Sequence, residues 1–257
     1  MFIKSKTNDK IKEVKELSKS AQSRREKSLF VCDGLRLCAD AVSSGSEIVN
    51  VFYTDSFLQK HEKDAISVIS AAKNSYEIDG SLMNYVSDTV SPQGIICVVK
   101  AKEKPLTLEK MKKYIALDDI QSPDNLGAVM RTAEALGIDG LIICGGCDIY
   151  NPKAVRASMG AVFRLPILKV KDLSGYINEC KDKGIYTYAS VPEKDASDIS
   201  EVDFRDGGIC VIGNEGNGIT ADVIDACKEK VTILMKGRAE SLNAAAAASI
   251  IMWEMTR

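Results

Sequence analysis

The stretch VIGNEGNGITAD (residues 211–222) runs from an apolar segment through a glycine-rich turn into the start of a helix. A strand, a glycine turn and a helix in this order are the layout of many nucleotide-binding sites. Glu215 lies inside the turn, however, and a carboxylate repels a bound phosphate. The stretch therefore indicates an α/β protein with a ligand site at the turn, and the acid raises the question of which ligand binds there.

The sequence around this turn alternates short apolar runs with helical patterns. Strands are expected at residues 114–120, 140–144, 164–170, 185–190, 208–213 and 230–235. Helices are expected at about 124–136, 151–159, 172–183, 219–229 and 242–257. Continuous apolar strands separated by helices predict a parallel sheet that is covered on both faces. Ligands of such sheets bind at the carboxyl ends of the strands.

The N-terminal part of the chain contains a smaller pattern of the same kind. Asn8 as an N-cap, followed by apolar residues Ile11, Val14 and Leu17 at helical spacing, predicts a helix over residues 8–20. Further strands are expected at 29–34, 48–54 and 94–99, and further helices at 35–45 and about 56–72. This part is therefore also expected to be α/β.

A charged segment separates the two patterns. It reads KAKEKPLTLEK (residues 100–110), contains a proline and has no periodicity, which is typical of a linker. We therefore expect one domain at residues 1–100, a linker at 101–110 and a second domain at 111–257.

Length and composition exclude several classes of protein. The chain has 257 residues, enough for one large domain or two small ones. No apolar run reaches the ~18 residues of a membrane span, and the first residues lack the apolar core of a secretory signal. We therefore expect a cytoplasmic protein without a membrane segment, in which the eight cysteines are mostly reduced core residues.

Two cysteines and the single histidine limit the possible chemistry. Cys144 and Cys147 form a C-x-x-C pair, which can be a redox pair or half of a zinc site. No second pair exists and His61 is distant in sequence, so a strand end followed by a glycine turn is the favoured interpretation. A single histidine also excludes a His-rich metal site, and we expect no metal.

Three of the expected strand ends in the second half carry polar side chains. Asn125 and Arg131 follow the first strand, Glu215 follows the fifth, and Ser241 and Asn243 follow the sixth. The dinucleotide fingerprint G-x-G-x-x-G would come after the first strand, whereas here the order is G-x-x-G-x-G and the position is late. This difference argues against a nicotinamide-dependent oxidoreductase.

Three segments resemble the motifs of a known family. SPDNLGAVMRTAEALG (122–137), IGNEGNGI (212–219) and SLNAAAAAS (241–249) resemble the three motifs of the TrmH/SpoU branch of the SPOUT RNA methyltransferases, and RASMGAVFRLPI (156–167) resembles the segment between the first two. SLFVCDGLRL and SPQGIICVV in the first hundred residues resemble the ribosomal-protein-like substrate-binding domain that precedes many of these enzymes.

The resemblance implies a fold, a reaction and a set of residues. It implies an α/β protein with a trefoil-knotted, parallel-sheet catalytic domain at 111–257 and a smaller RNA-binding α/β domain at 1–100. It also implies a homodimer that transfers a methyl group from S-adenosylmethionine to a ribose 2′-hydroxyl of RNA, without a metal. The implied catalytic residues are Asn125, Arg131, Glu215 and Asn243. The implied cofactor-binding residues are Ala189, Ser190, Gly213, Asn214, Gly218, Ile233, Met235, Ser241 and Leu242.

The implied chemistry suits these side chains. Methyl transfer from a sulfonium needs a positioned hydroxyl and a route for its proton. Arginine is a poor base, because its pKa is above ~12, so Arg131 could instead clamp a phosphate; the family proposal is that a phosphate helps it act on the hydroxyl. Glu215 could instead pair with Arg131 or with nearby amides, and Asn125 and Asn243 could be ordinary helix caps.

The cofactor also answers the opening question. S-adenosylmethionine carries a positive sulfonium and no phosphate, so an acid near its loop is not repelled, and glycines let the main chain approach the ligand. The sequence departs from the family pattern in two places: alanines fill 244–248 where valine and serine are usual, and Leu234 stands where proline is common. Neither departure changes an implied catalytic residue.

The target RNA is expected from charge and organisation. Residues 1–30 carry nine Lys or Arg against four Asp or Glu, in a chain of net charge −2, and such a segment can contact RNA or be a solvated surface. The candidate phosphate contacts are Arg24, Arg25, Arg36, Arg156 and Arg164. Ribosomal RNA is favoured over transfer RNA, because the extra domain suits a structured target. A non-catalytic RNA-binding or assembly factor is the alternative, although it would be expected to lose some motif residues.

Overall fold

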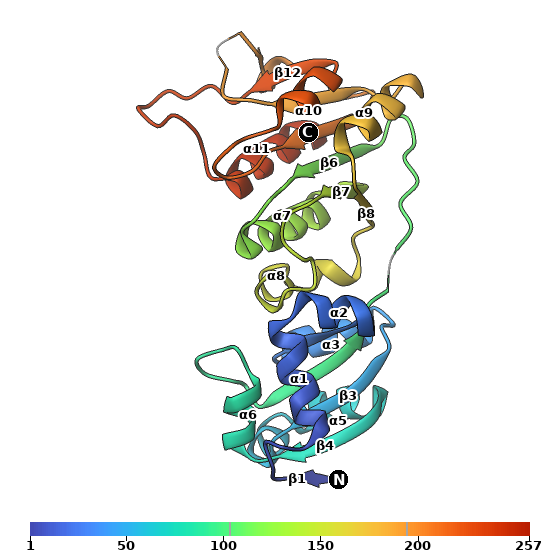
Figure 1. The fold of residues 1–257 in the computed structure, drawn as a ribbon, viewed down its shortest axis with the longest axis vertical. Helices are drawn as coiled ribbons and strands as arrows, with labels where there is room; N and C mark the ends of the chain where they lie inside the picture. Colours follow the sequence, from blue (N-terminus) through green and yellow to red (C-terminus); the bar gives the residue numbers. More distant parts are fainter. Residues whose placement is uncertain (103, 194) are drawn as a thin grey trace. The chain divides into compact units, whose positions relative to one another are not determined.

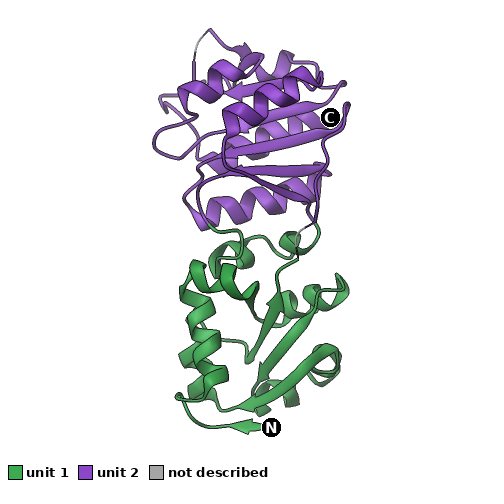
Figure 2. Ribbon diagram, turned by 45° about the vertical axis from the view of Figure 1, so that its right-hand side comes forward, with its two compact units in different colours: residues 1–102, 148–164 green, residues 103–147, 165–257 purple. Residues whose placement is uncertain are grey.

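The computed structural model describes residues 1–102, 104–193 and 195–257. The chain forms two compact units, which are coloured separately in Figure 2. Unit 1 comprises Met1–Lys102 and Asp148–Arg164, and unit 2 comprises Glu103–Cys147 and Leu165–Arg257. Both units are α/β, as the alternating sequence patterns predict.

Unit 1 contains a five-stranded mixed sheet with the order β1-β4-β3-β5-β2. Its strands are β1 (Phe2–Ile3), β2 (Leu29–Asp33), β3 (Ile48–Tyr53), β4 (Ala72–Ile78) and β5 (Ile95–Lys100). Its helices are α1 (Asp9–Lys19), α2 (Ala21–Lys27), α3 (Leu35–Ser43), α4 (Asp55–Lys60), α5 (Glu62–Ala71), α6 (Gly80–Val86), α8 (Pro152–Ala157) and the 3₁₀ turn η1 (Ala161–Phe163). Figure 1 labels most of these elements.

The N-terminal helix forms as the sequence predicts. Asn8 caps α1 and accepts a hydrogen bond from the Lys10 amide at 2.9 Å. Ile11, Val14 and Leu17 are fully buried, so the apolar stripe of the helix faces the core. Two expectations were incomplete: the helix expected at 56–72 is two helices, α4 and α5, and the sequence patterns did not indicate β4, whose AKNSYEI is mostly polar.

Residues 148–164 belong to the core of unit 1, although they lie in the second half of the sequence. Val155 and Phe163 pack with buried side chains of β2, β3, β5 and α3. The rings of Phe30 and Tyr150 stack with their centroids 4.5 Å apart. The compact units therefore divide the chain differently from the predicted linear boundary, because apolar side chains of this segment complete one face of the unit 1 sheet. The domain division at 1–100 and 111–257 stays a prediction.

Unit 2 contains a seven-stranded sheet with the order β10-β12-β9-β11-β6-β7-β8, in which every pairing is parallel. Its strands are β6 (Lys113–Asp118), β7 (Gly140–Cys144), β8 (Ile167–Val170), β9 (Thr187–Ser190), β10 (Ser197–Asp198), β11 (Gly208–Ile212) and β12 (Glu229–Thr232). Its helices are α7 (Pro123–Leu136), α9 (Leu173–Asp182), α10 (Ala221–Ala226), α11 (Ala244–Thr256) and the 3₁₀ turn η2 (Ile199–Glu201). The prediction of an all-parallel sheet is confirmed.

Both faces of the unit 2 sheet are buried. Tyr114 and Ala116 of β6 pack with residues of α9 and α10 in one cluster. Ile115 and Leu117 alternate with them, point to the opposite face and are also fully buried. Helix α11 packs on β6 and β11, and it also packs against α7. The continuous apolar strands in the sequence reflect this two-sided burial.

The predicted linker contains no helix or strand among its described residues, and residue 103 lies outside them. Leu106 and Leu108 nevertheless pack against the core of unit 2. The amide of Glu109 donates a hydrogen bond to the Tyr114 hydroxyl at 2.9 Å. The second half of this segment is therefore anchored to unit 2 and does not behave as a free tether.

Candidate active site

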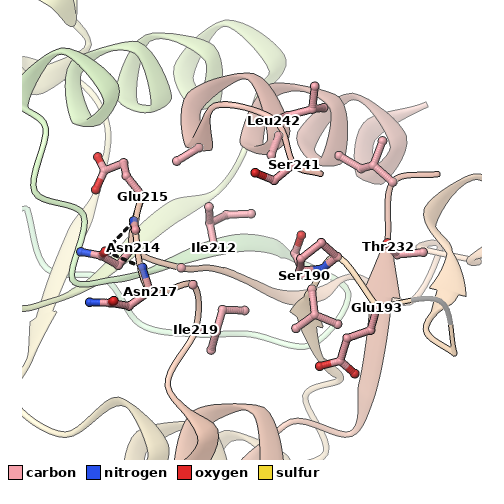
Figure 3. A pocket seen from close by; sticks show the side chains of 18 of the residues that line it. Ser190, Glu193, Ile212, Asn214, Glu215, Asn217, Ile219, Thr232, Ser241 and Leu242 are labelled. Atoms are coloured by element: carbon pink, nitrogen blue, oxygen red, sulfur yellow. Dashed lines mark hydrogen bonds between the residues drawn. The ribbon is translucent and has the colours of Figure 1, made fainter. Parts of the chain in front are cut away.

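The segments that follow three neighbouring strands of unit 2 surround a cavity. The strands β12, β9 and β11 are adjacent in the sheet, so the segments that follow them meet at one edge. The cavity has a volume of about 420 Å³, which is within the ~300–1,000 Å³ of small-molecule sites. Figure 3 shows the side chains that line it, with Ile212 and Ile219 among those near the middle.

The glycine turn is a closed loop with its own hydrogen bonds. The backbones of Asn214 and Gly218 pair in both directions, at 2.9 and 3.0 Å. The Asn214 side-chain oxygen accepts hydrogen bonds from the amides of Gly216 and Asn217, at 2.8 and 3.0 Å (Figure 3). The turn is therefore ordered by its own residues before any ligand binds.

Gly213 is required by the backbone of the turn. A Cβ atom at this position would lie 2.1 Å from the carbonyl carbon of Gly218 and 2.2 Å from the amide nitrogen of Ile219. Our expectation was that the glycines let the main chain approach a ligand. At Gly213 the close approach is instead between two parts of the turn itself.

Two acids at the end of β6 hold both ends of the turn. Asn214 Nδ2 donates to the backbone oxygen of Asp119 at 2.8 Å. Thr220 donates to Asp118 Oδ2 with its amide at 2.9 Å and its hydroxyl at 3.1 Å. Asp118 is buried, and Asp119 has a positive φ of 56°. Sequence analysis missed these residues, although the same strand-end argument that selected Asn125 applies to them.

Glu215 holds the start of α7. Its carboxylate accepts hydrogen bonds from the amides of Gln121 and Ser122, at 3.1 and 3.0 Å, and from Asn125 Nδ2 at 2.8 Å. Of the two alternatives left open by the sequence, the structure therefore shows the pairing with nearby amides, and no contact with Arg131 is found among the described residues.

The ionisation of Glu215 follows from these contacts. Partial burial raises the pKa of Glu215, but the hydrogen bonds from Asn125, Gln121 and Ser122 outweigh it and hold the pKa below its ordinary value. The carboxylate is therefore charged at neutral pH. A depressed pKa means that its contribution to stability is present above the ordinary glutamate value and is lost as the pH falls through the lowered one.

Asn125 and Asn243 extend this contact to the last motif. Asn243 Nδ2 donates to Asn125 Oδ1 at 3.0 Å. Asn243 also caps α11, because its side-chain oxygen accepts from the amides of Ala245 and Ala246. The cap of α7 is Ser122 and not Asn125. The capping alternative therefore applies to Asn243 only, and a chain Glu215–Asn125–Asn243 joins the three motifs.

Replacing Glu215 by glutamine should test this chain. An amide cannot accept from three N–H donors as a carboxylate does, and an unsatisfied donor costs ~1–3 kcal/mol, so the rate of methyl transfer should fall about tenfold to a hundredfold. The rate is compared with that of Glu240→Gln, an exposed glutamate of the segment after β12. Equal rates for the two variants would contradict the role of the chain.

Arg131 lies apart from the cavity. It is exposed on α7 and does not line the cavity wall. Among the described residues, no hydrogen bond or ion pair to its guanidinium is found. The structure thus brings together Asn125, Glu215 and Asn243 and leaves Arg131 free to contact a ligand that approaches from solvent.

The predicted cofactor-binding residues gather at the cavity. All of them except Ala189 line it; Ala189 is buried inside β9. Glu215, which the resemblance implies to be catalytic, also lines the cavity, together with its loop neighbours Gly216 and Asn217. The lining residues that the sequence did not indicate are Val191, Pro192, Glu193, Ile212, Ile219, Ile224, Thr232, Ala244 and Ala247. Many of these are apolar residues that read as core in the sequence, so no local pattern distinguishes them.

The walls of the cavity suit S-adenosylmethionine. Glu193 and Glu215 are acidic, and no lysine or arginine belongs to the part of the wall that the structure describes. Glu193 pairs with Lys230 outside the wall at 2.7 Å, so the carboxylate of Glu215 is the acid without a basic partner among the described residues. This charge favours a cationic ligand over a phosphorylated one. Ile212, Ile219 and Leu242 provide apolar surface for an adenine ring. The residues present therefore fit the sulfonium, the ammonium and the base of this cofactor.

The candidate RNA contacts separate into different environments, and one of them needs correction. Arg24 is only 4% exposed, and it donates to Asp148 Oδ2 and to the Leu17 carbonyl, both at 2.7 Å. It anchors residues 148–164 within unit 1 and is not available to RNA, because its guanidinium is buried and paired. Arg25 is exposed, and Arg164 is half-buried.

The remaining alternatives from the sequence are limited by the structure. Cys144 ends β7, and Gly145 and Gly146 have φ values of 65° and 71°, so the C-x-x-C pair is a strand end followed by a glycine turn. Neither Cys144 nor Cys147 forms a disulfide. In residues 1–102, 104–193 and 195–257 there is no cluster of three metal-ligating side chains, and no helix there is both long and apolar enough to cross a bilayer.

Comparisons with known proteins agree with this site. The model of the SpoU rRNA Methylase family matches residues 112–253, and that of the MRM3-like substrate binding domain matches residues 8–97. The chain is 28% identical over 254 residues to the 23S rRNA (guanosine(2553)-2′-O)-methyltransferase RlmP of Bacillus subtilis, covering 98% of both proteins.

Solved structures give the same result. An AdoMet-bound rRNA methyltransferase from Sinorhizobium meliloti is 26% identical with a TM-score of 0.87, covering 99% of this chain and 97% of that one. The SpoU methyltransferase AviRb from Streptomyces viridochromogenes, in complex with AdoMet, is 25% identical with a TM-score of 0.86, and 97% of each chain is covered. Both comparisons span the two units.

Proposed function

The chain belongs to the SpoU rRNA Methylase family and is an RNA ribose 2′-O-methyltransferase that uses S-adenosylmethionine, and we propose that it acts on ribosomal RNA through the site of unit 2. The observation that supports this most directly is the cavity at the glycine turn, next to the Glu215–Asn125–Asn243 chain. Its described wall contains acidic residues and no lysine or arginine, which disfavours a phosphorylated ligand. Ribosomal RNA is also the substrate named for the Bacillus subtilis and Sinorhizobium meliloti relatives, which match 98% and 99% of this chain.

In this proposal the lining residues hold the cofactor, which supplies an electrophilic methyl group when bound. Ile212, Ile219 and Leu242 would hold the base, and the carboxylates of the wall would favour the positive charges of the cofactor. The turn is preformed, so little ordering is needed on binding.

The RNA is oriented by residues outside the cavity. Arg131 has no partner among the described residues, and its planar guanidinium can grip an RNA phosphate with two hydrogen bonds. Such a grip positions the ribose hydroxyl for in-line attack on the methyl group. Asn125, Glu215 and Asn243 act as positioning residues, because they fix the starts of α7 and α11 relative to the turn. The clamp role is the one proposed for Arg131.

The test is methyl transfer from labelled S-adenosylmethionine to ribosomal RNA that lacks 2′-O-methylation. The RNA is digested, and the label is sought in ribose-methylated nucleosides. Transfer RNA forms the second arm, because label only there would replace ribosomal RNA with the alternative substrate. Cofactor binding without transfer to either RNA would contradict catalysis on these substrates and favour the RNA-binding factor.

We also propose a homodimer that uses the exposed face of α11. Ile250 and Trp253 are 38% and 56% exposed, and they lie three residues apart on that helix. Large exposed apolar side chains on one helix face are typical of interfaces. We propose two further features that the sequence implied: a trefoil knot in the catalytic domain and a cytoplasmic location.

Replacing Trp253 by glutamate should convert the dimer into a monomer. A buried charge without a partner costs several kcal/mol at an interface, so the dissociation constant of the dimer should rise by at least about a hundredfold. Light scattering coupled to size exclusion measures the mass. Ile66→Glu, at another exposed apolar side chain, is the matched control, and an unchanged dimer in Trp253→Glu would exclude this face.

A further inference from the structure

We propose that unit 1 has a binding pocket of its own for one unpaired nucleotide of the RNA substrate. The pocket is a hollow of about 280 Å³ between the end of β2, the start of α3, the segment before β5 and the end of α8. This inference rests on the proposed function, because it takes the ligand to be RNA. The lining residues are Asp33, Gly34, Arg36, Leu37, Thr89, Ser91, Gln93, Arg156 and Met159.

The rim of the pocket is organised by side-chain hydrogen bonds. Ser87 donates to Asp33 Oδ2 at 2.5 Å, and the Ser87 and Thr89 hydroxyls lie 2.8 Å apart. Gln93 Oε1 accepts from the Leu35 amide at 2.8 Å, and so takes the place of a side-chain cap that Gly34 cannot supply. The segment before β5 is therefore tied at two points to the strand and helix that form the opposite wall.

Two arginines line this hollow without a protein partner. Arg36 is exposed on α3, and Arg156 is half-buried at the end of α8. No hydrogen bond or ion pair of either guanidinium is found within the described parts of the chain. The nearby Asp88 pairs with Lys15 at 3.8 Å. The two arginines are therefore available for a phosphate, which guanidinium groups bind through paired hydrogen bonds.

The other lining groups suit a nucleobase. For the second carboxylate oxygen of Asp33, no hydrogen bond is found among the described residues, so it can accept from a base N–H group. Leu37 and Met159 add apolar surface for the faces of a base. Proteins read unpaired RNA bases in this way, through their hydrogen-bonding edges and faces. The combination of arginines, a carboxylate and apolar surface distinguishes a nucleotide from a simple anion.

The electrostatic state of Asp33 agrees with a partly enclosed pocket. Burial raises the pKa of Asp33, and the hydrogen bond from Ser87 and the charge of Arg156 oppose that effect. Arg156 is thus close enough to act on Asp33, although the two do not form an ion pair. A bound nucleotide would donate a base N–H group to Asp33 and place its phosphate against Arg156. Each side chain would then have the hydrogen-bond partner that it lacks among the described residues.

The first test compares RNA binding by the full chain with that of a variant carrying Arg36→Gln and Arg156→Gln. The probe is ribosomal RNA that lacks 2′-O-methylation, and binding is measured over a range of KCl concentrations. The dissociation constant should rise about tenfold or more, and the salt slope should fall by roughly one for each lost phosphate contact. The affinity for S-adenosylmethionine should stay near wild type, because neither arginine lines the cavity of unit 2.

The second test replaces Asp33 by asparagine, because charge alone and the proposed base contact predict opposite changes in RNA affinity. Removing a negative charge near RNA should strengthen binding if charge alone mattered. If Asp33 accepts from a base, Asp33→Asn should instead weaken binding several-fold without lowering the salt slope. Ser87→Ala is measured beside it, to separate loss of the base contact from movement of the segment before β5.

The outcomes separate this inference from the proposed function. The control is Lys63→Gln, which removes an exposed charge on α5. The pocket is overturned if the arginine variant binds RNA with the same dissociation constant and salt slope as this control. It is also overturned if Asp33→Asn binds RNA more tightly than the wild type. A wild-type protein that transfers no methyl group, yet loses RNA affinity in these variants, would sink the proposed function and leave the pocket standing. Circular dichroism and thermal melting exclude misfolded variants from the comparison.

Discussion

Alanine at Arg131 is expected to lower the rate of methyl transfer about a hundredfold to a thousandfold, while cofactor affinity and stability stay at wild-type values. Removing one preorganised charge-stabilising donor from an active site has effects of this size. Arg131 is exposed and without a partner in the described chain, so its removal leaves no unsatisfied buried group. Its loss should therefore appear in the reaction and not in folding.

The measurement is single-turnover methyl transfer at saturating RNA, together with calorimetric titration of the cofactor and thermal melting. Arg131→Lys should recover only part of the rate, because an ammonium is a point charge and cannot form the paired hydrogen bonds of a guanidinium. Arg205→Ala is the control, since Arg205 is exposed in unit 2 and pairs only locally with Asp203. A rate in Arg131→Ala within about twofold of this control would remove Arg131 from the catalytic set.

Alanine at Gly213 is expected to weaken cofactor binding by at least about tenfold. The added methyl group would lie 2.1 Å from the backbone of Gly218, a distance at which the turn must move. Overpacking of this kind costs ~1–3 kcal/mol even when side chains can adjust, and here the obstacle is main chain. Since the turn forms one wall of the cavity, its displacement changes the shape that the cofactor meets.

The neighbouring glycine offers a matched control. A Cβ at Gly216 would meet only the Asn214 side-chain oxygen, at 3.6 Å, which is an ordinary contact. Gly216→Ala should therefore bind S-adenosylmethionine about as well as the wild type. Both affinities can be measured by titration calorimetry, with melting temperatures recorded in parallel. Equal affinities of Gly213→Ala and Gly216→Ala would contradict the role of the tight turn.

The two substitutions should thus produce different defects. Arg131→Ala should leave the cofactor bound and slow the chemical step, because the arginine does not line the cavity and its proposed role is to grip the RNA. Gly213→Ala weakens binding before any reaction occurs, because it acts on the wall of the cavity. Measuring rate and cofactor affinity for both variants separates the orientation of RNA from the binding of the methyl donor.

The sequence by itself determined the α/β class and the parallel sheet of unit 2. It also predicted eight of the residues that line the cavity, and their role in cofactor binding stays a prediction. These features follow from local patterns: short apolar runs become two-sided buried strands, and polar or glycine residues after them collect at one edge. Ser190, Gly213 and Leu242 come from three such strand ends and meet at the same cavity.

Only the tertiary structure decided which groups contact each other. Glu215 meets Asn125 across 90 positions of sequence, and Arg24 meets Asp148 across 124. Local periodicity carries no information about such pairs, because they depend on how the sheets and the segments between them fold back. For the same reason the sequence indicated Arg24 as a candidate phosphate contact, whereas packing buries it. Nothing in the sequence indicated that Val155 and Phe163 of residues 148–164 pack in the core of unit 1.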